Sequence, residues 1–249
     1  MNLTFQIYDA FGDWISANGL IRYLAEGYET VTLIHDTPAV VPFTTDMFRD
    51  NPKIKAIVGT PSGDCDVVDA RVHESYQTPN ILGRYFSSSN RLSDTQYPYS
   101  DNGSGFYAEL GVNPEHRTSD FYYMRDLKAE LDVFEMVDPP KDYSVICEMY
   151  DGMLNVDRTN VINLHRLTDN FAHTLKLIEN AKEVHLIENS ISLFLYHMQM
   201  IDAIDSKPIT LHAYARREPH RRCDGPDCNN PYLNMLKCPH LHNWNFIWQ

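Results

Sequence analysis

Long apolar runs are missing from this sequence, and positive charge is scarce. No stretch approaches the ~20 apolar residues of a membrane-spanning helix, so we expect no membrane span. The 21 Lys and Arg residues face 34 Asp and Glu residues, and the net charge of −13 argues against a general nucleic-acid binder or a polybasic membrane-surface protein. Residues 1–8, MNLTFQIY, resemble a strand with no basic region before it, so we expect no signal peptide and a cytoplasmic location (the host cytoplasm for a viral protein).

The sequence also lacks the glycine motifs of several common catalytic sites. The turn after the first expected strand, Asp9-Ala10-Phe11-Gly12-Asp13, does not supply G-x-G-x-x-G, which argues against NAD-dependent hydride transfer. There is no P-loop, and without a G-x-S-x-G elbow an esterase has no nucleophile. Asp64-Cys65-Asp66 has the letters of a D-x-D metal motif, but its position next to Gly63 favours the flank of a strand.

Cysteine is rare, with five residues spread along the chain: Cys65, Cys147, Cys223, Cys228 and Cys238. An odd, scattered set suits reduced thiols in a cytosol-like compartment. The spacing of Cys223 and Cys228 is allowed for zinc, whereas the cluster of Cys238, His240 and His242 is not a common structural zinc pattern. A turn followed by packing residues is the favoured interpretation, and zinc binding stays open.

What the sequence does contain is an alternation of short apolar strands and amphipathic helices. This alternation predicts an α/β protein with parallel sheets in two Rossmann-like lobes. The expected strands are 2–9, 28–35, 54–58, 65–68, 143–148, 160–164, 184–187 and 208–212, and the expected helices are 14–24, 44–49, 106–110, 169–179 and 190–204.

Composition changes indicate where the lobes and loops lie. Pro139-Pro140 predicts a linker, which divides the chain into lobes 1–138 and 139–249. Residues 76–105 are rich in Ser, Asn, Tyr and Pro and predict loops with a short helix. The tail from residue 216 is expected to be irregular, and its aromatic end, NWNFIW, to pack back on a lobe because it would otherwise expose an apolar patch.

The polar turn at Glu188-Asn189-Ser190 is the first candidate site. It follows the apolar strand 184–187 and precedes an apolar helix for which Asn189 or Ser190 is a suitable N-cap. A turn from a strand into a helix can bind an anion, because unpaired backbone N–H groups and the positive end of the helix dipole point towards it. An ordinary turn with no ligand is the alternative.

The second candidate site is Gly12-Asp13, directly after the first strand. Glycine lets the backbone approach a ligand, and the Asp13 carboxylate is a candidate general base for an acceptor hydroxyl. Asp13 as the N-cap of the following helix is an equally good interpretation.

Three other polar features have both a binding and a structural interpretation. Glu188 can hydrogen bond a sugar hydroxyl pair or cap a helix. His165, just past strand 160–164, begins a ligand-facing loop or is a hydrogen-bonded structural histidine. A basic patch could hold phosphate, although a solvated loop is the more usual answer; it consists of Arg216, Arg217, His220, Arg221 and Arg222.

Two long segments together resemble GT-B glycosyltransferase-like proteins related to the heptosyltransferases, which occur in bacteria, phages and large DNA viruses. FGDWISANGLIRYL (11–24) is similar to their N-terminal GDxIxxNGLIRxL segment. VINLHRLTDNFAHTLKLIENAKEVHLIENSISLFLYHM (161–198) is similar to INLxxLTDNxxxxLxLIxNAKEIHxIDSSxxHxxD, and PITLHAYAR (208–216) to the strand that follows. Ala10 replaces a family glycine, and Glu188-Asn189-Ser190 replaces DSS.

The resemblance implies a GT-B fold, in which two Rossmann-like lobes face each other across a cleft. The N-terminal lobe would present the acceptor, with Asp13 as the catalytic base and Gly12, Asn18 and Arg22 on the acceptor side. The C-terminal lobe would bind the nucleotide-sugar donor, with its diphosphate at a helix N-terminus. The expected donor-binding residues are His165, Glu188, Asn189, Ser190 and Ser192.

The expected function is therefore transfer of a sugar from a nucleotide-sugar co-substrate to a glycan or small-molecule acceptor. No metal or cofactor is obligatory, because a helix dipole, backbone N–H groups and basic side chains can stabilise a diphosphate leaving group. A non-catalytic relative that binds a sugar or a partner is the main alternative. Another nucleotide-dependent Rossmann enzyme is opposed by the missing glycine fingerprint. Donor, acceptor, stereochemistry and oligomeric state stay open.

Overall fold

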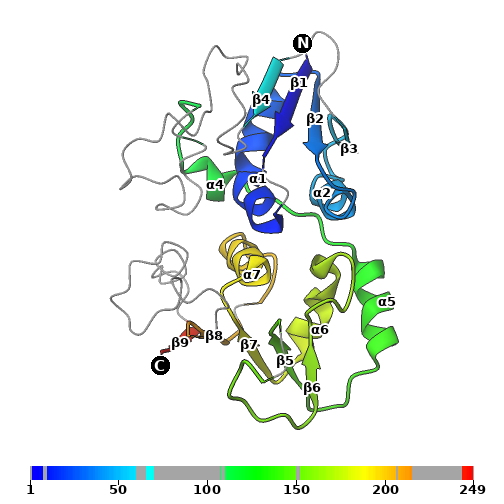
Figure 1. Ribbon diagram of the computed structural model, residues 1–249, viewed down its shortest axis with the longest axis vertical. Helices are drawn as coiled ribbons and strands as arrows, with labels where there is room; N and C mark the ends of the chain where they lie inside the picture. Colours follow the sequence, from blue (N-terminus) through cyan, green and yellow to red (C-terminus); the bar gives the residue numbers. More distant parts are fainter. Residues whose placement is uncertain are drawn as a thin grey trace. The chain divides into compact units, whose positions relative to one another are not determined.

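The computed structural model describes residues 2–7, 10–59, 66–69, 107, 110–149, 152–205, 207–214 and 243–248. The chain forms two compact units, residues 1–124 and 125–249, and each is described separately below. Each unit contains one sheet in which all the paired strands are parallel, so the predicted α/β class with parallel sheets is confirmed (Figure 1).

The first unit is built on a four-stranded sheet with the order β3-β2-β1-β4. Its expected strands and the expected helices 14–24 and 44–49 are present, with changes at their ends, and α4 is an additional short helix. Most of the expected helix 106–110 lies outside the described residues. The elements are β1 (Asn2–Gln6), α1 (Phe11–Glu26), β2 (Thr30–His35), α2 (Val41–Met47), β3 (Ile54–Val58), β4 (Asp66–Asp69) and α4 (His116–Ser119).

Helix α1 is the central element of this unit. Eleven of its 16 residues are buried, and Trp14 contacts both Phe5 of β1 and His35 of β2, with ring centroids 6.3 and 4.4 Å apart. On another side the phenol of Tyr107 accepts a hydrogen bond from Leu20 N and donates one to Ser16 O. The N-terminal end of α1 is thereby fixed relative to β1.

The second unit has a five-stranded sheet with the order β6-β5-β7-β8-β9. The expected helix 169–179 begins as a 3-10 turn, because the Asn170 side chain accepts a hydrogen bond from Ala172 N and starts the helix there. The elements are α5 (Leu127–Val137), β5 (Ser144–Cys147), β6 (Val161–Asn163), η3 (Phe171–Thr174), α6 (Leu175–Asn180), β7 (Glu183–Leu186), α7 (Ser190–Met200), β8 (Ile209–His212) and β9 (Trp244–Ile247).

The division between the units falls before α5 and not at Pro139-Pro140. Helix α5 packs on η3 and α6. Arg125 also joins the start of α5 to α6, because its guanidinium bonds the carboxylates of both Glu130 and Glu179. Glu130 is buried, so these ion pairs hold α5 firmly to the second unit.

Strand β9 corrects the expectation of a tail that only packs back on a lobe. Residues Trp244–Ile247 pair with β8 in parallel register, and Trp244 Nε1 donates to Gln199 of α7 at 2.7 Å. Aromatic and β-branched residues favour strands, and the WNFI segment has that composition. The rest of the predicted tail lies outside the described residues, as do residues 76–105.

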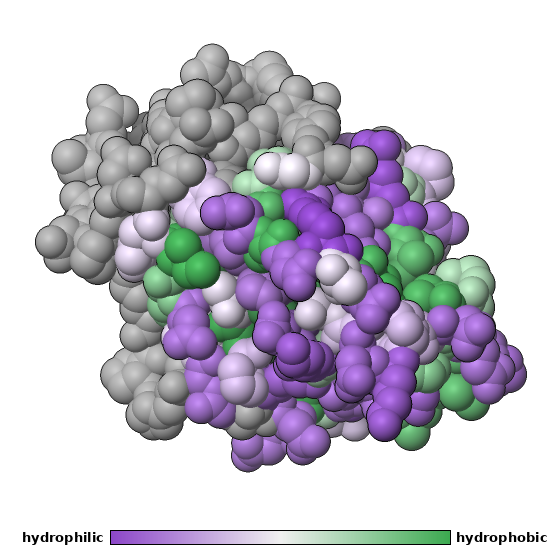
Figure 2. Space-filling model, turned by 90° about the horizontal axis from the view of Figure 1, so that it is seen from below, coloured by the Kyte–Doolittle hydropathy of each residue, from purple (hydrophilic) through white to green (hydrophobic). Residues whose placement is uncertain are grey.

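In the described part of the chain, no helix is both long enough and apolar enough to cross a membrane. On the face shown in Figure 2, hydrophilic residues predominate and apolar residues form small separate areas. The exposed apolar side chains include Leu127 and Met136 on α5.

Gly19 lets α1 and α4 approach each other closely. A Cβ atom built on Gly19 would lie 2.0 Å from the backbone oxygen of His116, a distance at which the two helices must move apart. Gly27, at the end of α1, is different, since its Cβ would meet only Leu24 O at 3.7 Å.

We expect Gly19→Ala to lower the free energy of unfolding by about 1–3 kcal/mol, because the added methyl group must displace backbone rather than a flexible side chain. Gly27→Ala is the matched control and should cause no loss, because its φ of −83° suits alanine. Urea denaturation of both variants measures the difference. Equal stability of the two variants would contradict the close packing of α1 on α4.

Candidate functional site

Both sequence-predicted sites lie where the strand order of a sheet reverses. In the first unit the chain runs outward from β1 to β2 and β3, and β4 then pairs on the other side of β1. In the second unit it runs from β5 to β6 and returns to β7 on the other side of β5. Ligands of open parallel sheets bind at the carboxyl ends of strands beside such a reversal. Helix α1 follows β1 and helix α7 follows β7 at these points.

The N-terminus of α7 is organised by a capping box. Asn189 is the N-cap: its side chain accepts a hydrogen bond from Ser192 N at 3.0 Å, and Ser192 Oγ accepts one from Asn189 N at 3.0 Å. Asn189 Nδ2 also donates to Cys147 Sγ at 3.0 Å, which joins the cap to the end of β5. Asn189 as N-cap was one of the two possibilities predicted for this helix, and it is confirmed.

The capping box decides which groups of the turn are available to a ligand. The side chains of Asn189 and Ser192 are engaged within the turn, so neither is a free donor. The N–H groups of Ser190 and Ile191 belong to the first turn and have no acceptor within the helix. Ser190 is partly exposed. An anion at this turn would therefore meet two N–H groups, the Ser190 hydroxyl and the positive end of the helix dipole.

The Cys147 sulfur accepts a hydrogen bond from the N-cap residue and is not suited to act as a nucleophile. Burial raises the pKa of the Cys147 thiol to about 11, even though the hydrogen bond from Asn189 works in the opposite direction. The sulfur is therefore a neutral thiol near pH 7, whereas a nucleophilic cysteine needs the thiolate.

Asp13 lies in the first turn of α1, inside the helix. The N-cap is Ala10, so the prediction that Asp13 could be the N-cap is wrong. Asp13 is only 7% exposed, and none of the described residues donates a hydrogen bond to its carboxyl oxygens. Burial raises the pKa of Asp13 to about 7. A buried, uncompensated carboxyl group of this kind is typical of functional sites.

We expect Asp13→Asn to stabilise the protein at high pH. The Asp13 carboxyl ionises near pH 3.8 in the unfolded chain and near pH 7 in the folded one, so its ionisation lowers stability as pH rises between these values. The difference corresponds to about 4 kcal/mol above pH 7 and to almost nothing near pH 4. Urea denaturation of wild type and Asp13→Asn from pH 4 to pH 8 measures it.

The control for this experiment is Asp132→Asn on α5. Asp132 is exposed and pairs only with the exposed Lys128 among the described residues, so its replacement should change stability little at any pH. A stability difference for Asp13→Asn that does not grow with pH would contradict the raised pKa of Asp13.

Asn18 and Arg22 hold the first unit together. Asn18 is fully buried and exchanges two hydrogen bonds with the backbone of Tyr122, at 3.1 and 3.2 Å. Arg22 binds both carboxylate oxygens of Asp50 at 2.8 Å and donates to Asn18, Met47 O and Tyr122 O. Their polar groups are occupied by contacts within the unit, so we do not include Asn18 or Arg22 among the residues of the candidate site.

The other predicted site residues divide between the two sheets. Gly12 is buried beside Asp13 in α1. Glu188 follows β7, is 5% exposed, and has interactions of its own. His165 follows β6, an edge strand that β5 separates from β7, and its N–H donates to Asn163 Oδ1 at 3.0 Å. The second unit thus brings Glu188 and the capping turn together, with His165 two strands away.

A pocket of about 460 Å³ in the second unit was not predicted from the sequence. It lies at the carboxyl ends of β8 and β9 and the loop after β5. His212 and Ile247 end strands and Trp248 directly follows one, which is the one sequence signal that could have indicated them. The described lining consists of Gly152, Met153, Asn155, His212, Tyr214, Ile247 and Trp248.

No group of three or more His, Cys, Asp or Glu side chains suited to a metal ion is found in the part of the chain that the structure describes. The predicted zinc candidates Cys223, Cys228, Cys238, His240 and His242 lie outside that part, as does the basic patch from residue 216 to 222. Of the D-x-D letters, only Asp66 is described, as the first residue of β4.

Comparison with known proteins gives no match from which a function could be transferred. No protein-family model, no curated protein and no solved structure matches the chain. The resemblance to GT-B glycosyltransferase-like proteins therefore stays a prediction.

Proposed function

We propose that this protein transfers a sugar from a nucleotide-sugar donor to a hydroxyl group of a glycan or small acceptor, with Asp13 as general base and no obligatory metal. The GT-B fold, in which two parallel-sheet units share one site, is part of the proposal. The resemblance of residues 11–24 and 161–198 to that family supports it, as does the parallel sheet of each unit.

The observation that most strongly supports catalysis is the state of Asp13. A buried carboxylate that gains no hydrogen bond or ion pair from the described residues opposes folding when it ionises, and this supports a functional role for Asp13. Its pKa of about 7 is well suited to a general base, because about half of the groups are ionised at neutral pH and the conjugate acid binds the proton firmly.

The proposed reaction needs one proton acceptor. The acceptor hydroxyl oxygen attacks the anomeric carbon, and the bond from that carbon to the diphosphate breaks. The hydroxyl proton passes to Asp13, and the bonding electron pair leaves with the nucleoside diphosphate.

The N-terminus of α7 would bind that leaving group. The diphosphate gains charge as its bond to the sugar breaks, and the N–H groups of Ser190 and Ile191 are fixed by the capping box before the reaction begins. Donors that are already oriented stabilise developing charge without reorganisation. This turn lies beside the reversal in strand order, where ligands of parallel sheets bind.

We expect Asp13→Asn to abolish sugar transfer and to leave nucleotide binding unchanged. Binding of UDP, GDP or ADP is measured by thermal unfolding, because a ligand at one hundred times its dissociation constant stabilises the folded state by about 2.7 kcal/mol. Transfer is measured with the corresponding nucleotide sugars. Unchanged turnover in Asp13→Asn would remove Asp13 as the base.

We expect Ser190→Glu to weaken binding of these diphosphates at least about tenfold more than Ser190→Gln does. The two variants have similar side chains, but only Glu places a negative charge beside the diphosphate. A carboxylate in the first helical turn does not disturb α7, because it interacts favourably with the helix dipole. Equal affinities measured by calorimetry for the two variants would contradict a diphosphate at this turn.

Binding without turnover is the second candidate function. Both Asn189 and Ser192 have their side chains engaged in capping, which leaves few side-chain groups to orient a sugar. Stabilisation by a nucleoside diphosphate, with no transfer or hydrolysis of any nucleotide sugar, would favour this non-catalytic alternative.

A further inference from the structure

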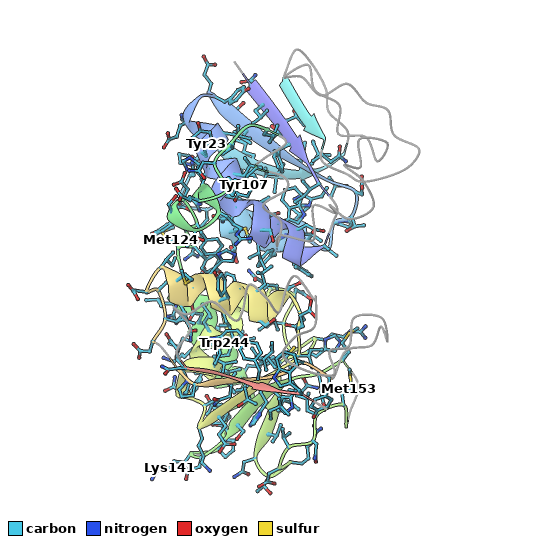
Figure 3. The ribbon with its side chains drawn as sticks, turned by 90° about the vertical axis from the view of Figure 1, so that its left-hand side faces the viewer. Tyr23, Tyr107, Met124, Lys141, Met153 and Trp244 are labelled. Carbon is cyan, nitrogen blue, oxygen red and sulfur yellow. The ribbon has the colours of Figure 1, made fainter. Side chains whose placement is uncertain are left out.

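The pocket in the second unit is lined by both apolar and polar groups. Trp248 and Ile247 form one wall at the end of β9, and Met153 and the ring of Tyr214 contribute to the others. The Tyr214 ring packs on a buried apolar cluster that contains Ile146, Leu154 and Ile187. Figure 3 shows Met153 near the end of β9, whereas Trp244 lies at the beginning of that strand, beside α7. The aromatic rings of Tyr214 and Trp248 in this lining offer stacking surface to a planar ring.

The loop that carries Gly152, Met153 and Asn155 is fixed by a buried carboxylate. Glu148 is fully buried, and it accepts hydrogen bonds from Arg158 and from the N–H groups of Gly152 and Leu154. Burial opposes the charge of Glu148, but these bonds outweigh it and lower the pKa of the carboxyl group. The loop is folded around the Glu148 carboxylate, so the conformation of this side of the pocket is fixed before any ligand binds.

A chain of hydrogen bonds runs from the pocket to an exposed carboxylate. Tyr214 Oη lies 3.1 Å from His212 Nδ1, and His212 Nε2 lies 3.1 Å from His185 Nδ1 on the neighbouring strand. His185 Nε2 lies 3.3 Å from Glu183 Oε2. At the pocket end, Asn155 N donates to Tyr214 Oη at 3.2 Å.

The carboxylate at the end of the chain sets the direction of every hydrogen bond in it. A carboxylate only accepts, so His185 in its neutral form carries its proton on Nε2 and accepts at Nδ1. His212 then donates from Nε2 and accepts at Nδ1, and the proton it accepts comes from the Tyr214 hydroxyl. Burial lowers the pKa of His212 to about 4, so this imidazole is neutral near pH 7.

The direction of the chain leaves Tyr214 with one free acceptor site. Its hydroxyl proton goes to His212, and one of its lone pairs receives the N–H of Asn155. The second lone pair is left for a donor in the pocket. The Asn155 side-chain amide, on the exposed edge of the same pocket, supplies a further donor and acceptor.

We propose that this pocket binds a planar heteroaromatic ring that carries an N–H group, the chemistry of a nucleobase, and that Tyr214 accepts a hydrogen bond from that N–H. Trp248 and Tyr214 supply aromatic surface to the pocket, and aromatic side chains stack on any base. The inference goes beyond the proposed sugar transfer, which does not require this pocket.

Fluorescence of Trp248 reports directly on the site. The chain has three tryptophans; Trp14 and Trp244 are buried, and Trp248 is partly exposed at the pocket. We expect adenosine, guanosine, cytidine or uridine to quench the emission of the full-length protein, and Trp248→Phe to remove the quenching. Tyr214→Phe should weaken binding of that nucleoside about tenfold, which corresponds to one hydrogen bond. Tyr23→Phe, a partly exposed tyrosine of the first unit, is the matched control and should have no effect.

A methylated nucleoside separates the hydrogen bond from general packing. The analogue whose N–H is methylated should bind wild type about tenfold more weakly than the parent nucleoside. For guanosine or uridine this is the ring N–CH₃ compound, and for adenosine or cytidine it is the compound with a dimethylated exocyclic amine. For Tyr214→Phe, the methylated analogue and the parent nucleoside should bind with similar affinity, because the hydroxyl acceptor is already missing. Equal losses on both proteins would overturn the role of Tyr214 as acceptor.

The origin of the ring follows from a comparison of nucleosides with nucleoside diphosphates. If the ring is the base of the donor, UDP, GDP or ADP binds more tightly than its nucleoside. Ser190→Glu then removes the extra affinity of the diphosphate and leaves the affinity of the nucleoside unchanged. If it belongs to a separate ligand, Ser190→Glu changes neither affinity. Both results support a ring site, and neither depends on turnover or on Asp13. Absence of quenching by every nucleoside and diphosphate at millimolar concentration, with the fold intact by circular dichroism, would overturn the proposal.

Discussion

Parallel pairing of β5 with β7 is the constraint on which the second unit depends. It holds Cys147 at the same level as Leu186, so the turn after β7 meets the end of β5 and Asn189 can donate to the Cys147 sulfur. In a parallel sheet each connection reaches the next strand at its amino end. The turns that follow the carboxyl ends of the strands therefore lie together at the other end of the sheet. The first unit uses the same arrangement at β1 and β4, and there it presents Asp13. Both candidate sites are therefore consequences of strand order more than of any single motif.

The two units treat a buried carboxylate in opposite ways. Glu148 is surrounded by Arg158 and two backbone N–H groups, and its charge contributes to the fold. Asp13 has no such partner among the described residues, and burial moves its pKa towards neutrality. A group that opposes folding when it ionises has to be explained by something other than stability. This contrast, more than the acidity of either residue, distinguishes the candidate base from a structural ion pair.

Local patterns in the sequence were sufficient for the elements of both sheets except β9, and for the cap at Asn189. These features depend on apolar runs and on side-chain groups within one turn, which are visible in a short window of sequence. The pocket could not be predicted in this way, because His185 and His212 meet only through the pairing of β7 with β8. Asn18 and Arg22 were expected on the acceptor side, but contacts with residues far along the chain, such as Asp50 and Tyr122, engage both. Helix α5 was missed although it has a local signal, the side-chain N-cap at Asp126.

Strand β9 occupies one edge of the second sheet and, among the described strands, pairs with β8 alone. Its detachment would break one ladder of hydrogen bonds and the Trp244–Gln199 contact, while the four remaining strands stay paired. Edge strands of this kind open at lower free energy than central ones. One wall of the pocket, carrying Ile247 and Trp248, thus lies on one of the two edge strands of its sheet, the other being β6. Release of β9 would open that wall of the pocket without unfolding the rest of the sheet.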